Sequence, residues 1–402
     1  MRILLFDPSV VGHHLEYPSH FMNYVANKGV NHELHFAVHS EFEHRAPDLV
    51  ELANAYPDRL KVHPIDESEQ NAVESASISR RVLSSWNIAE KYARKLEVDH
   101  CVFLEMNLYQ PVLGLLRARN VPFRISGILF FPYVRIEVAN SSFLERVKAK
   151  IERYRKHWQI RWVLSNPQME AIFLFNDAKG AQQLNAIHAT NKFRALPDPV
   201  LPRKGYTEET ASPFKPTDAR GHFLFFGAMR KQKGVRELIQ AMRLLSEKEA
   251  RQTALHILGR SSEDFANELR RLVEGLRQAQ PHLHVQHEDR FLEYAELERA
   301  LDSCDVVLAP YQRTEGSSGV IGHAAKHGKP VIGPNTGLIG TLIRDYGLGR
   351  ATNTSDPSDI AGAIQEALDD PRELASKEDM QRYVNERSPD QFASTVVETL
   401  AE

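Results

Sequence analysis

Short runs of β-forming residues alternate with helix-like segments along the whole chain, and this alternation restricts the fold more than any other feature of the sequence. Repeated strand–helix–strand units are typical of a parallel sheet covered by helices. The expected strands are residues 3–6, 33–38, 60–65, 100–104, 123–128 and 171–175, then 222–226, 254–258, 282–286, 306–310, 330–332 and 347–351. The pattern predicts an α/β protein with two doubly wound parallel-sheet domains.

A boundary between the two series lies at residues 201–221, which contain three prolines and two glycines and have no helical or strand periodicity. Such a composition is typical of a linker. We expect a first domain over residues 1–200 and a second over 222–387. Residues 388–402 are expected to form a C-terminal helix that packs back on the first domain. In sheets of this kind, ligands bind beyond the carboxyl ends of the strands.

The overall composition excludes several classes of protein. The net charge of −3 gives no electrostatic basis for nucleic-acid binding. The two cysteines, Cys101 and Cys304, stand in separate halves beside apolar runs, as expected for buried thiols in a reducing compartment. Apolar runs are far shorter than the ~20 residues that span a bilayer, and the first strand turns polar at Asp7, too early for a signal peptide. We predict a cytoplasmic protein.

A basic turn follows the expected strand at 222–226. It runs from Gly227 through Arg230 and Lys233 to Gly234, where a helical pattern begins. Cations beside a helix N-terminus, whose amides and dipole already favour anions, suit a diphosphate. A solvated basic turn without a ligand has the same sequence.

A second loop, rich in small residues, follows the expected strand at 306–310. Its residues are Glu315, Gly316, Ser317, Ser318 and Gly319. Small side chains let a ligand approach the backbone closely, so the amides there can hold phosphate or sugar oxygens. The Glu315 carboxylate can accept two sugar hydroxyls, or it can cap the helix that follows.

The segments FFGAMRKQKGVRELIQA and APYQRTEGSSGVIGHAAKHGKPVIG together resemble the group 1 (family 4-like) retaining glycosyltransferases. The resemblance extends over most of residues 220–350 and, more weakly, to VVGHHLEY at 10–17. It implies two Rossmann-like domains facing across a cleft, the GT-B fold. The implied reaction is metal-independent transfer of a sugar from a nucleotide-diphosphate-sugar donor to a hydroxyl acceptor, as in polysaccharide biosynthesis. The donor is then a substrate, and no cofactor is expected.

The resemblance also assigns roles to single residues. Lys233 matches the lysine that neutralises the donor diphosphate, and Glu315 matches the first glutamate of an E-x7-E motif that holds donor-sugar hydroxyls. The family's arginine is Ala228 here, and Arg230 stands two residues further on, within reach of the same phosphate. Lys233, Arg230 and Glu315 are the expected catalytic residues. The expected donor-binding residues are Gly12, His13, Gly227, Gly316, Ser317, Ser318, Gly319 and His323.

Two further positions depart from the family pattern. The second glutamate of E-x7-E is His323, and the glutamate of the G-x-P-E turn is Thr341. A neutral imidazole can hydrogen-bond a ribose hydroxyl, whereas nearby phosphates would favour an imidazolium that binds the anion. Together with Ala228, these departures keep open a catalytically degenerate homologue or partner subunit that binds nucleotide sugars. A nucleotide-sugar epimerase, which shares this architecture, is a further alternative.

Further candidate residues lie at strand ends of the first half. Gly12, His13 and His14 follow the first strand, and Glu105 follows the strand at 100–104. Glycine permits close approach of the donor diphosphate or the acceptor, His13 or His14 can contact either, and Glu105 suits an acceptor-side role. A loop histidine and a surface carboxylate without ligands are the alternatives. His323 and His327 have zinc-ligand spacing, but alanine follows the first histidine, so we expect no metal site.

Residues 142–163 show a helical stripe of large apolar side chains, namely Phe143, Val147, Ile151, Tyr154, Trp158 and Trp162. Seven lysines and arginines accompany only two glutamates in this segment. A basic helix with an apolar face suits an anionic membrane surface or a lipid-linked acceptor. An ordinary helix packed on the sheet shows the same stripe.

Overall fold

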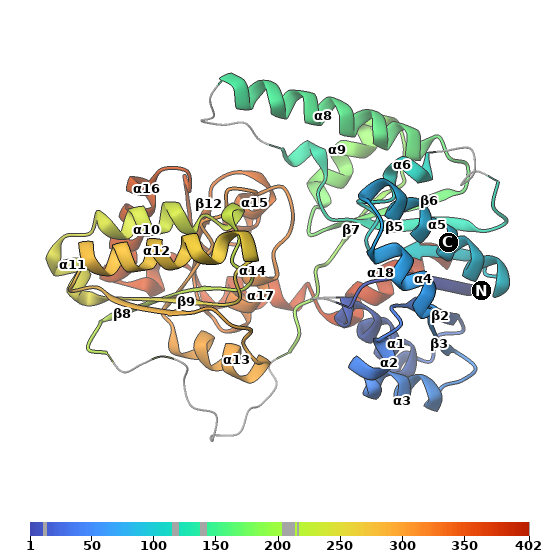
Figure 1. Ribbon diagram of the computed structural model, residues 1–402, viewed down its shortest axis with the longest axis horizontal. Coiled ribbons are helices and arrows are strands. Elements are labelled where there is room, and N and C mark those ends of the chain that lie inside the picture. The colour runs from blue at the N-terminus through green and yellow to red at the C-terminus, as the bar shows by residue number, and fades with distance from the viewer. Residues whose placement is uncertain (11–13, 115–119, 137–142, 203–213, 215–216, 402) are drawn as a thin grey trace. The chain divides into compact units, whose positions relative to one another are not determined.

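A computed structural model describes residues 1–10, 14–114, 120–136, 143–202, 214 and 217–401, without the side chains of Phe143 and Glu145. The chain divides into two compact units, the first made of Met1–Asp198 with Pro389–Glu402 and the second of Pro199–Ser388. Each described unit is built on one parallel sheet with helices on its faces (Figure 1). The predicted α/β class with two doubly wound sheets is confirmed. Most of the expected linker, residues 203–213 and 215–216, lies outside the described residues.

The first unit has a seven-stranded parallel sheet in its described part, in the order β3-β2-β1-β4-β5-β6-β7. The strands are β1 (Arg2–Asp7), β2 (Glu33–Val38), β3 (Leu60–Pro64), β4 (His100–Phe103), β5 (Arg124–Leu129), β6 (Met169–Phe175) and β7 (Phe193–Leu196). Its helices are α1 (Glu16–Lys28), α2 (Phe42–Arg45), α3 (Pro47–Ala55), α4 (Glu67–Glu74), α5 (Ile78–Lys95), α6 (Gln110–Leu113), α8 (Phe143–Leu164), α9 (Ala178–His188) and α18 (Pro389–Ala401), with the 3-10 helix η2 (Tyr133–Arg135).

Strand β1 shows why this sheet is covered on both faces. Leu4 and Phe6 belong to one apolar cluster, and Ile3 and Leu5 belong to another. Alternate residues of a strand point to opposite faces, so the two clusters lie on opposite faces of the sheet. All four side chains are buried. A sequence that is apolar on both faces requires helices on both, which is the doubly wound arrangement.

The last helix of the chain, α18, belongs to the first unit. Phe392 stacks on Tyr17 of α1 with ring centroids 5.3 Å apart, and it lies 5.1 Å from the ring of Phe21. These contacts bury the apolar face of α18 against α1, far from it in sequence.

The second unit has a six-stranded parallel sheet in its described part, in the order β10-β9-β8-β11-β12-β13. The strands are β8 (Gly221–Phe226), β9 (Thr253–Leu258), β10 (His284–Glu288), β11 (Val306–Leu308), β12 (Val331–Pro334) and β13 (Gly349–Thr352). Its helices are α10 (Val235–Arg243), α11 (Glu247–Gln252), α12 (Glu263–Ala279), α13 (Tyr294–Ser303), α14 (Gly319–Lys326), α15 (Gly337–Asp345), α16 (Pro357–Asp369) and α17 (Lys377–Asn385), with the 3-10 helices η3 (Lys231–Lys233) and η4 (Pro371–Leu374). The strand expected at 282–286 begins two residues later, because the amide of Leu283 closes a turn onto the carbonyl of Gln280.

Helix α8 differs from the expectation that its apolar stripe packs on the sheet. Buried Ile160 and Val163 attach the C-terminal part of the helix to the first unit's core. The exposed side chains, 37% to 69% accessible, are Leu144, Val147, Ile151, Tyr154, Trp158 and Trp162. The packing interpretation is therefore wrong for this stripe. Across the described residues, no helix combines the length and apolar character needed to cross a membrane.

Candidate active site

The loop between β8 and α10 is shaped by two glycines with positive φ. Gly227 (φ 104°) directly follows β8, with open space around the position of a Cβ atom. Gly234 (φ 76°) is the N-cap of α10, and a Cβ atom there would collide with the carbonyl oxygen of Pro310. The amide of Gln312 also donates to the carbonyl of Gln232 at 2.9 Å. The basic turn therefore packs directly against the loop that follows β11.

Lys233 lies where these two loops meet. Its ammonium nitrogen is 3.8 Å from the centroid of the Tyr311 ring, and the tyrosine is buried. Arg230, on the same turn, is exposed to solvent. The structure thus places Lys233 beside the small-residue loop and leaves the Arg230 guanidinium at the surface of the turn.

Glu315 is a largely buried carboxylate whose position is fixed by its neighbours. It accepts hydrogen bonds from Nη2 and Nε of Arg313, at 2.7 and 2.8 Å, and from the amide of Thr314 at 3.1 Å. The carbonyl of Thr314 in turn accepts from the amide of Leu338 at 2.7 Å, at the start of α15. The alternative in which Glu315 caps α14 is wrong, because the N-cap residue is Ser318.

The small residues of this loop lead into α14. Gly316 is buried, Ser317 and Ser318 are half-buried, and Gly319 is exposed with nothing near the position of a Cβ atom. The Ser318 hydroxyl donates to the hydroxyl oxygen of Tyr311 at 3.3 Å. The start of α14 is therefore accessible at Gly319, beside the residue that contacts Lys233.

His323 lies one turn further along α14, with its ring 6.0 Å from that of Phe226 at an interplanar angle of 82°. Its Nδ1 atom is buried and has no hydrogen-bond partner among the described residues. Burial, reinforced by the charge of Lys326, lowers the pKa of His323 to about 4. The ring is therefore neutral at pH 7.

The two other departures from the family pattern are Thr341 and Ala228. The Thr341 hydroxyl donates to the carbonyl of Gly337 in the first turn of α15, at 2.9 Å. Ala228 is exposed beside Gly227 and carries no polar group.

In the first unit, a cavity of about 260 Å³ opens at the carboxyl ends of β1 and β4, between the loops that follow them and helices α4 and α5. Nδ1 of His14 lies 2.8 Å from both carboxylate oxygens of buried Asp7, and its Nε2 lies 4.0 Å from Glu105. The structure thus confirms that Glu105 lies at the same strand edge as the loop after β1. Gly12 and His13 lie outside the described residues.

Charge and burial compete in this cavity. Burial raises the pKa of Asp7, and the hydrogen bond and charge of His14 only partly offset it. Burial opposes protonation of His14, but the hydrogen bond and charge of Asp7 outweigh it and raise its pKa. Burial also raises the pKa of Glu105.

Sequence reasoning missed Tyr311 and a buried polar cluster between α13 and α14. In that cluster Lys326 donates to Glu298 at 2.6 Å and to the Tyr294 hydroxyl at 2.9 Å, and His327 Nδ1 lies 2.8 Å from Asp302. Polar residues three or four apart on each helix were the available signal, but their partners lie 25 to 32 residues away in the sequence. In the described part of the chain, no three histidine, cysteine or acidic side chains are grouped so as to hold a metal ion.

The chain has two doubly wound units, with loops beyond the carboxyl ends of their strands. This arrangement is that of the GT-B class of protein. Solved structures of that class match the whole chain. Sucrose-phosphate synthase from Thermosynechococcus elongatus is 16% identical with a TM-score of 0.70, covering 100% of this chain and 98% of its own. Anabaena HepE in complex with UDP is 13% identical with a TM-score of 0.62, and both chains are covered completely. WaaG, a glycosyltransferase involved in lipopolysaccharide biosynthesis, is 14% identical with a TM-score of 0.62, covering 98% and 99%.

The family model of group 1 glycosyl transferases matches residues 220–370, the part of the chain that holds the loops of Lys233 and Glu315. No curated protein matches the sequence significantly. The whole chain has the two-domain GT-B fold, and its residues 220–370 match the group 1 glycosyltransferases.

Proposed function

We propose that this glycosyltransferase moves a sugar from a nucleotide-diphosphate-sugar donor to a hydroxyl acceptor, with retention of configuration and without a metal ion. The observation that carries the proposal is the position of Lys233 against Tyr311, which brings a cation to the start of α14. HepE has been solved with UDP and with UDP-glucose, so a UDP-sugar is the first donor to test.

The chemistry rests on stabilising the departing diphosphate. Lys233 supplies positive charge and the amides at 316–319 supply hydrogen-bond donors, a fixed environment for the charge that develops on the leaving oxygen. Arg230 reaches the same phosphates from the outer side of the turn. Glu315, held by Arg313 and Thr314, positions the hydroxyls of the donor sugar.

Bond making and bond breaking occur on one face of the anomeric carbon. The acceptor oxygen bonds to that carbon as its bond to the diphosphate oxygen breaks, and the acceptor proton passes to the departing phosphate. No protein nucleophile is required. His323, with its neutral ring, is assigned to the nucleotide half of the donor.

The test is a panel of radiolabelled nucleotide sugars incubated with the full chain, with slow hydrolysis to free sugar as readout, with and without EDTA. We expect hydrolysis of at least one UDP-sugar at an EDTA-insensitive rate. Binding without turnover would indicate a degenerate homologue, and conversion to an epimer without free sugar would indicate an epimerase. Activity lost in EDTA and restored by one divalent cation would refute metal independence.

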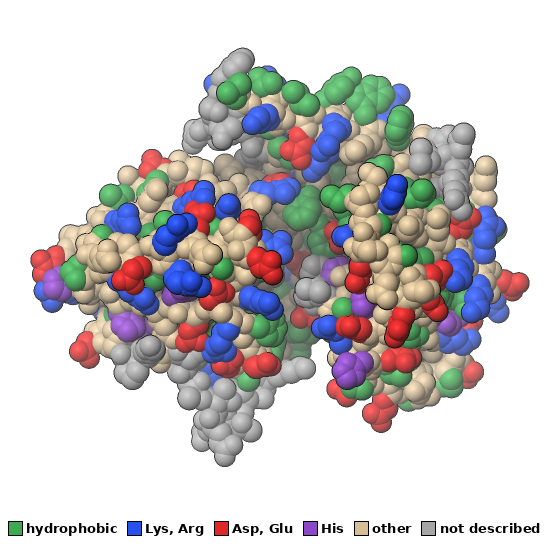
Figure 2. Space-filling model, viewed as in Figure 1, with side chains coloured by type: hydrophobic (Ala, Val, Ile, Leu, Met, Phe, Trp, Pro, Cys, Tyr) green, Lys and Arg blue, Asp and Glu red, His purple; other side chains and the backbone are tan. Residues whose placement is uncertain are grey.

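We further propose that α8 places the enzyme on the surface of an anionic membrane, where a lipid-linked acceptor would be found. Hydrophobic side chains gather along α8 at the top of the view, with lysine and arginine side chains beside them (Figure 2). The exposed apolar stripe can enter the headgroup region while the excess of cations binds anionic lipid.

Co-sedimentation with vesicles tests this part of the proposal. We expect binding to phosphatidylglycerol-containing vesicles, much weaker binding to pure phosphatidylcholine, and loss of binding in Ile151→Asp with Trp162→Asp. Phe291→Asp, at an exposed aromatic of the second unit, is the control and should bind normally. Equal binding by the double variant would refute the role of α8.

A further inference from the structure

Two oppositely charged side chains are buried together between α13 and α14, one helical turn beyond His323. The ammonium of Lys326 and the carboxylate of Glu298 are 2.6 Å apart, and only 3% and 2% of their side chains are exposed. The ammonium also donates to the hydroxyl oxygen of Tyr294 at 2.9 Å. Two acceptors from α13 therefore fix the position of this cation against α14.

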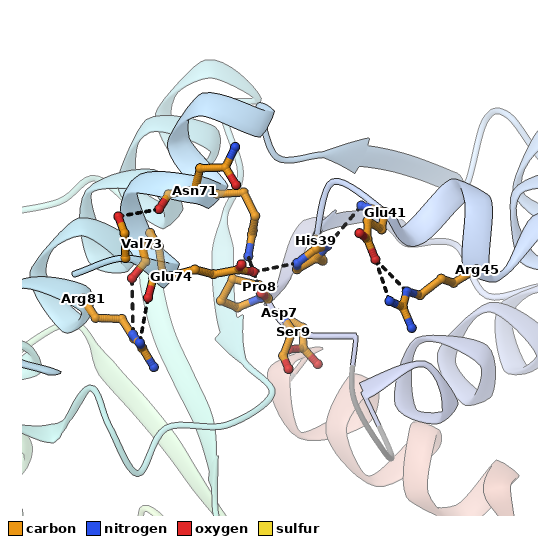
Figure 3. A network of polar contacts seen from close by, with 12 residues as sticks. Asp7, Pro8, Ser9, His39, Glu41, Arg45, Asn71, Val73, Glu74 and Arg81 are labelled. Atoms are coloured by element: carbon orange, nitrogen blue, oxygen red, sulfur yellow. Dashed lines mark hydrogen bonds and ion pairs between the residues drawn. The ribbon is translucent and has the colours of Figure 1, made fainter. Parts of the chain in front are cut away.

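An ion pair of the first unit shows how a surface contact differs. Figure 3 shows Arg45 against Glu41, 2.7 Å apart, with both side chains about half exposed. Water and salt screen such a pair, so its charges act little on groups further away. The pair of Lys326 and Glu298 lacks that screening. Because apolar side chains of similar volume often stabilise a core equally well, a buried ion pair calls for a role besides stability.

The His323 ring lies beside this buried pair. Its Nδ1 atom is buried and has no hydrogen-bond partner among the described residues, although the residue as a whole is half-buried. The charges that act on the ring within the described chain come from Lys326 and His327 of α14 and from Glu298 of α13. The neighbour from β8 is the uncharged ring of Phe226. Of these charges the ammonium has the largest effect, and it adds to burial in lowering the pKa of His323.

A charge on the His323 ring would change how a nucleotide binds. Diphosphate oxygens are negative, and a nearby anion favours the protonated form of histidine. Protonation on binding would make nucleotide affinity depend on pH in the neutral range. The buried cation of Lys326 opposes that protonation. Since Nδ1 is covered, Nε2 is the ring nitrogen that a ligand can reach.

We propose that Lys326 is a positioning residue for the donor nucleotide, because its ammonium, fixed by Glu298 and Tyr294, keeps the ring at position 323 uncharged when the diphosphate binds. The neutral ring then offers Nε2 to one oxygen of the nucleotide. This inference rests on the proposed function, since it concerns the nucleotide contact that the function assigns to His323.

The test measures UDP affinity of the full chain at pH 6 and pH 8 in Lys326→Gln, by calorimetry. The glutamine amide can still donate to Glu298 and Tyr294, but the positive charge is lost and the carboxylate remains near the ring. The ring should then take up a proton as UDP binds. Beyond the change that wild type shows, UDP should therefore bind about threefold or more tightly at pH 6 than at pH 8.

Two further variants separate this effect from a general disturbance of α14. Adding His323→Ala to Lys326→Gln should remove the extra pH dependence, because substitutions that act through one ring are not additive. Asp302→Asn is the matched control. It removes a carboxylate from the same pair of helices, where Asp302 lies 2.8 Å from His327, and it should keep the pH profile of wild type.

A second pair of substitutions keeps the inference testable if Lys326→Gln does not fold. Lys326→Gln with Glu298→Gln removes both buried charges together. Because the ammonium acts on the His323 ring more strongly than the carboxylate does, this variant should show a smaller shift in the same direction.

NMR titration of the His323 ring without nucleotide separates this inference from the proposed function. We expect a higher pKa of His323 in Lys326→Gln than in wild type. An unchanged pKa, a pH profile of UDP affinity equal to that of wild type, or an extra pH dependence that survives His323→Ala would overturn the inference and leave the proposed function standing. A raised pKa in a chain that binds no nucleoside diphosphate or nucleotide sugar would refute the proposed function and, with it, the role of Lys326 in nucleotide binding.

Discussion

The ammonium group of Lys233 lies over the ring of Tyr311, 3.8 Å from the ring centroid. The two residues come from loops that follow different strands, β8 and β11, which are neighbours in the sheet. A cation over an aromatic face is attracted by the ring quadrupole, so the contact holds the lysine at the start of α14. The basic turn and the small-residue loop therefore pack together as one structural feature.

Lys233→Ala should lower kcat/KM for the donor by about two to three powers of ten, because the departing diphosphate loses its nearest cation. Lys231→Ala is the control. That lysine lies on the same turn but its ammonium group faces Glu268 at 4.0 Å. Steady-state hydrolysis or transfer rates check the difference. Equal turnover by Lys233→Ala and wild type would remove Lys233 from the mechanism.

Tyr311→Leu tests the aromatic contact itself. We expect a loss of about tenfold in kcat/KM, smaller than for Lys233→Ala, since the cation remains but is less well placed. Tyr311→Phe keeps the ring and loses only the hydrogen bond from Ser318, so it should retain most of the activity. If Tyr311→Phe loses as much as Tyr311→Leu, the hydroxyl rather than the ring matters.

Much of this fold and of the loops that carry Lys233 and Glu315 could be predicted from the sequence because the signals are local. Central strands such as β1 and β8 are apolar runs of the length a buried parallel strand requires, and Gly227 and Gly234 mark the turns that need positive φ. The positions after strand ends and the family resemblance predict Lys233 and Glu315. They do not predict Tyr311, the packing partner of Lys233, because residues that meet from distant parts of the chain leave no periodic trace.

Helix α8 shows what the sequence pattern could not predict. Its apolar stripe predicts a buried face, yet Ile160 and Val163 are the buried residues and Trp158 and Trp162 are exposed. Periodicity identifies an amphipathic helix but carries no information about what the apolar face meets. The same holds for Lys326, whose burial depends on Glu298 from another helix.

Glu315→Gln should weaken binding of the intact nucleotide sugar more than binding of the free nucleoside diphosphate. The carboxylate is assigned to sugar hydroxyls, and an amide can accept with only one of its two end atoms. Calorimetry with both ligands gives the comparison, with Glu274→Gln on the exposed face of α12 as control. Equal losses for the two ligands would contradict the assignment.

Glu298→Gln should destabilise the second unit by about 3 kcal/mol, because it leaves the buried ammonium of Lys326 without its anion. Hydrogen bonds and charges from His327 and Lys326 outweigh burial and hold the pKa of Glu298 at about 2. Its contribution is therefore fully present above pH 4.5 and is lost as the pH falls through about 2. Urea denaturation at neutral pH measures the loss, and Lys326→Met in the same chain should recover part of it. A double variant less stable than Glu298→Gln would contradict the pairing.

His323→Ala should weaken nucleoside diphosphate binding by roughly 1–2 kcal/mol, the scale of one lost hydrogen bond to a polar ligand. The neutral ring has a buried Nδ1 atom without a partner in the described residues and lies beside Phe226, which ends β8. His323→Glu should restore or improve the affinity if the pocket otherwise follows the family pattern. His282→Ala, on the surface of the same unit, should bind normally.

The pH dependence separates a nucleotide contact from a packing role for the same ring. Because the pKa of His323 is lowered from 6.5 to about 4, it binds fewer protons in the folded than in the unfolded chain. Its contribution to stability is present above pH 6.5 and falls as the pH drops from 6.5 toward 4, so His323→Ala should flatten that part of the stability curve. Nucleotide affinity in the wild type should show no titration of this residue between pH 6 and 8. If His323→Ala flattens the stability curve yet binds the nucleoside diphosphate as tightly as wild type, the residue serves packing and the E-x7-E match fails at its second position.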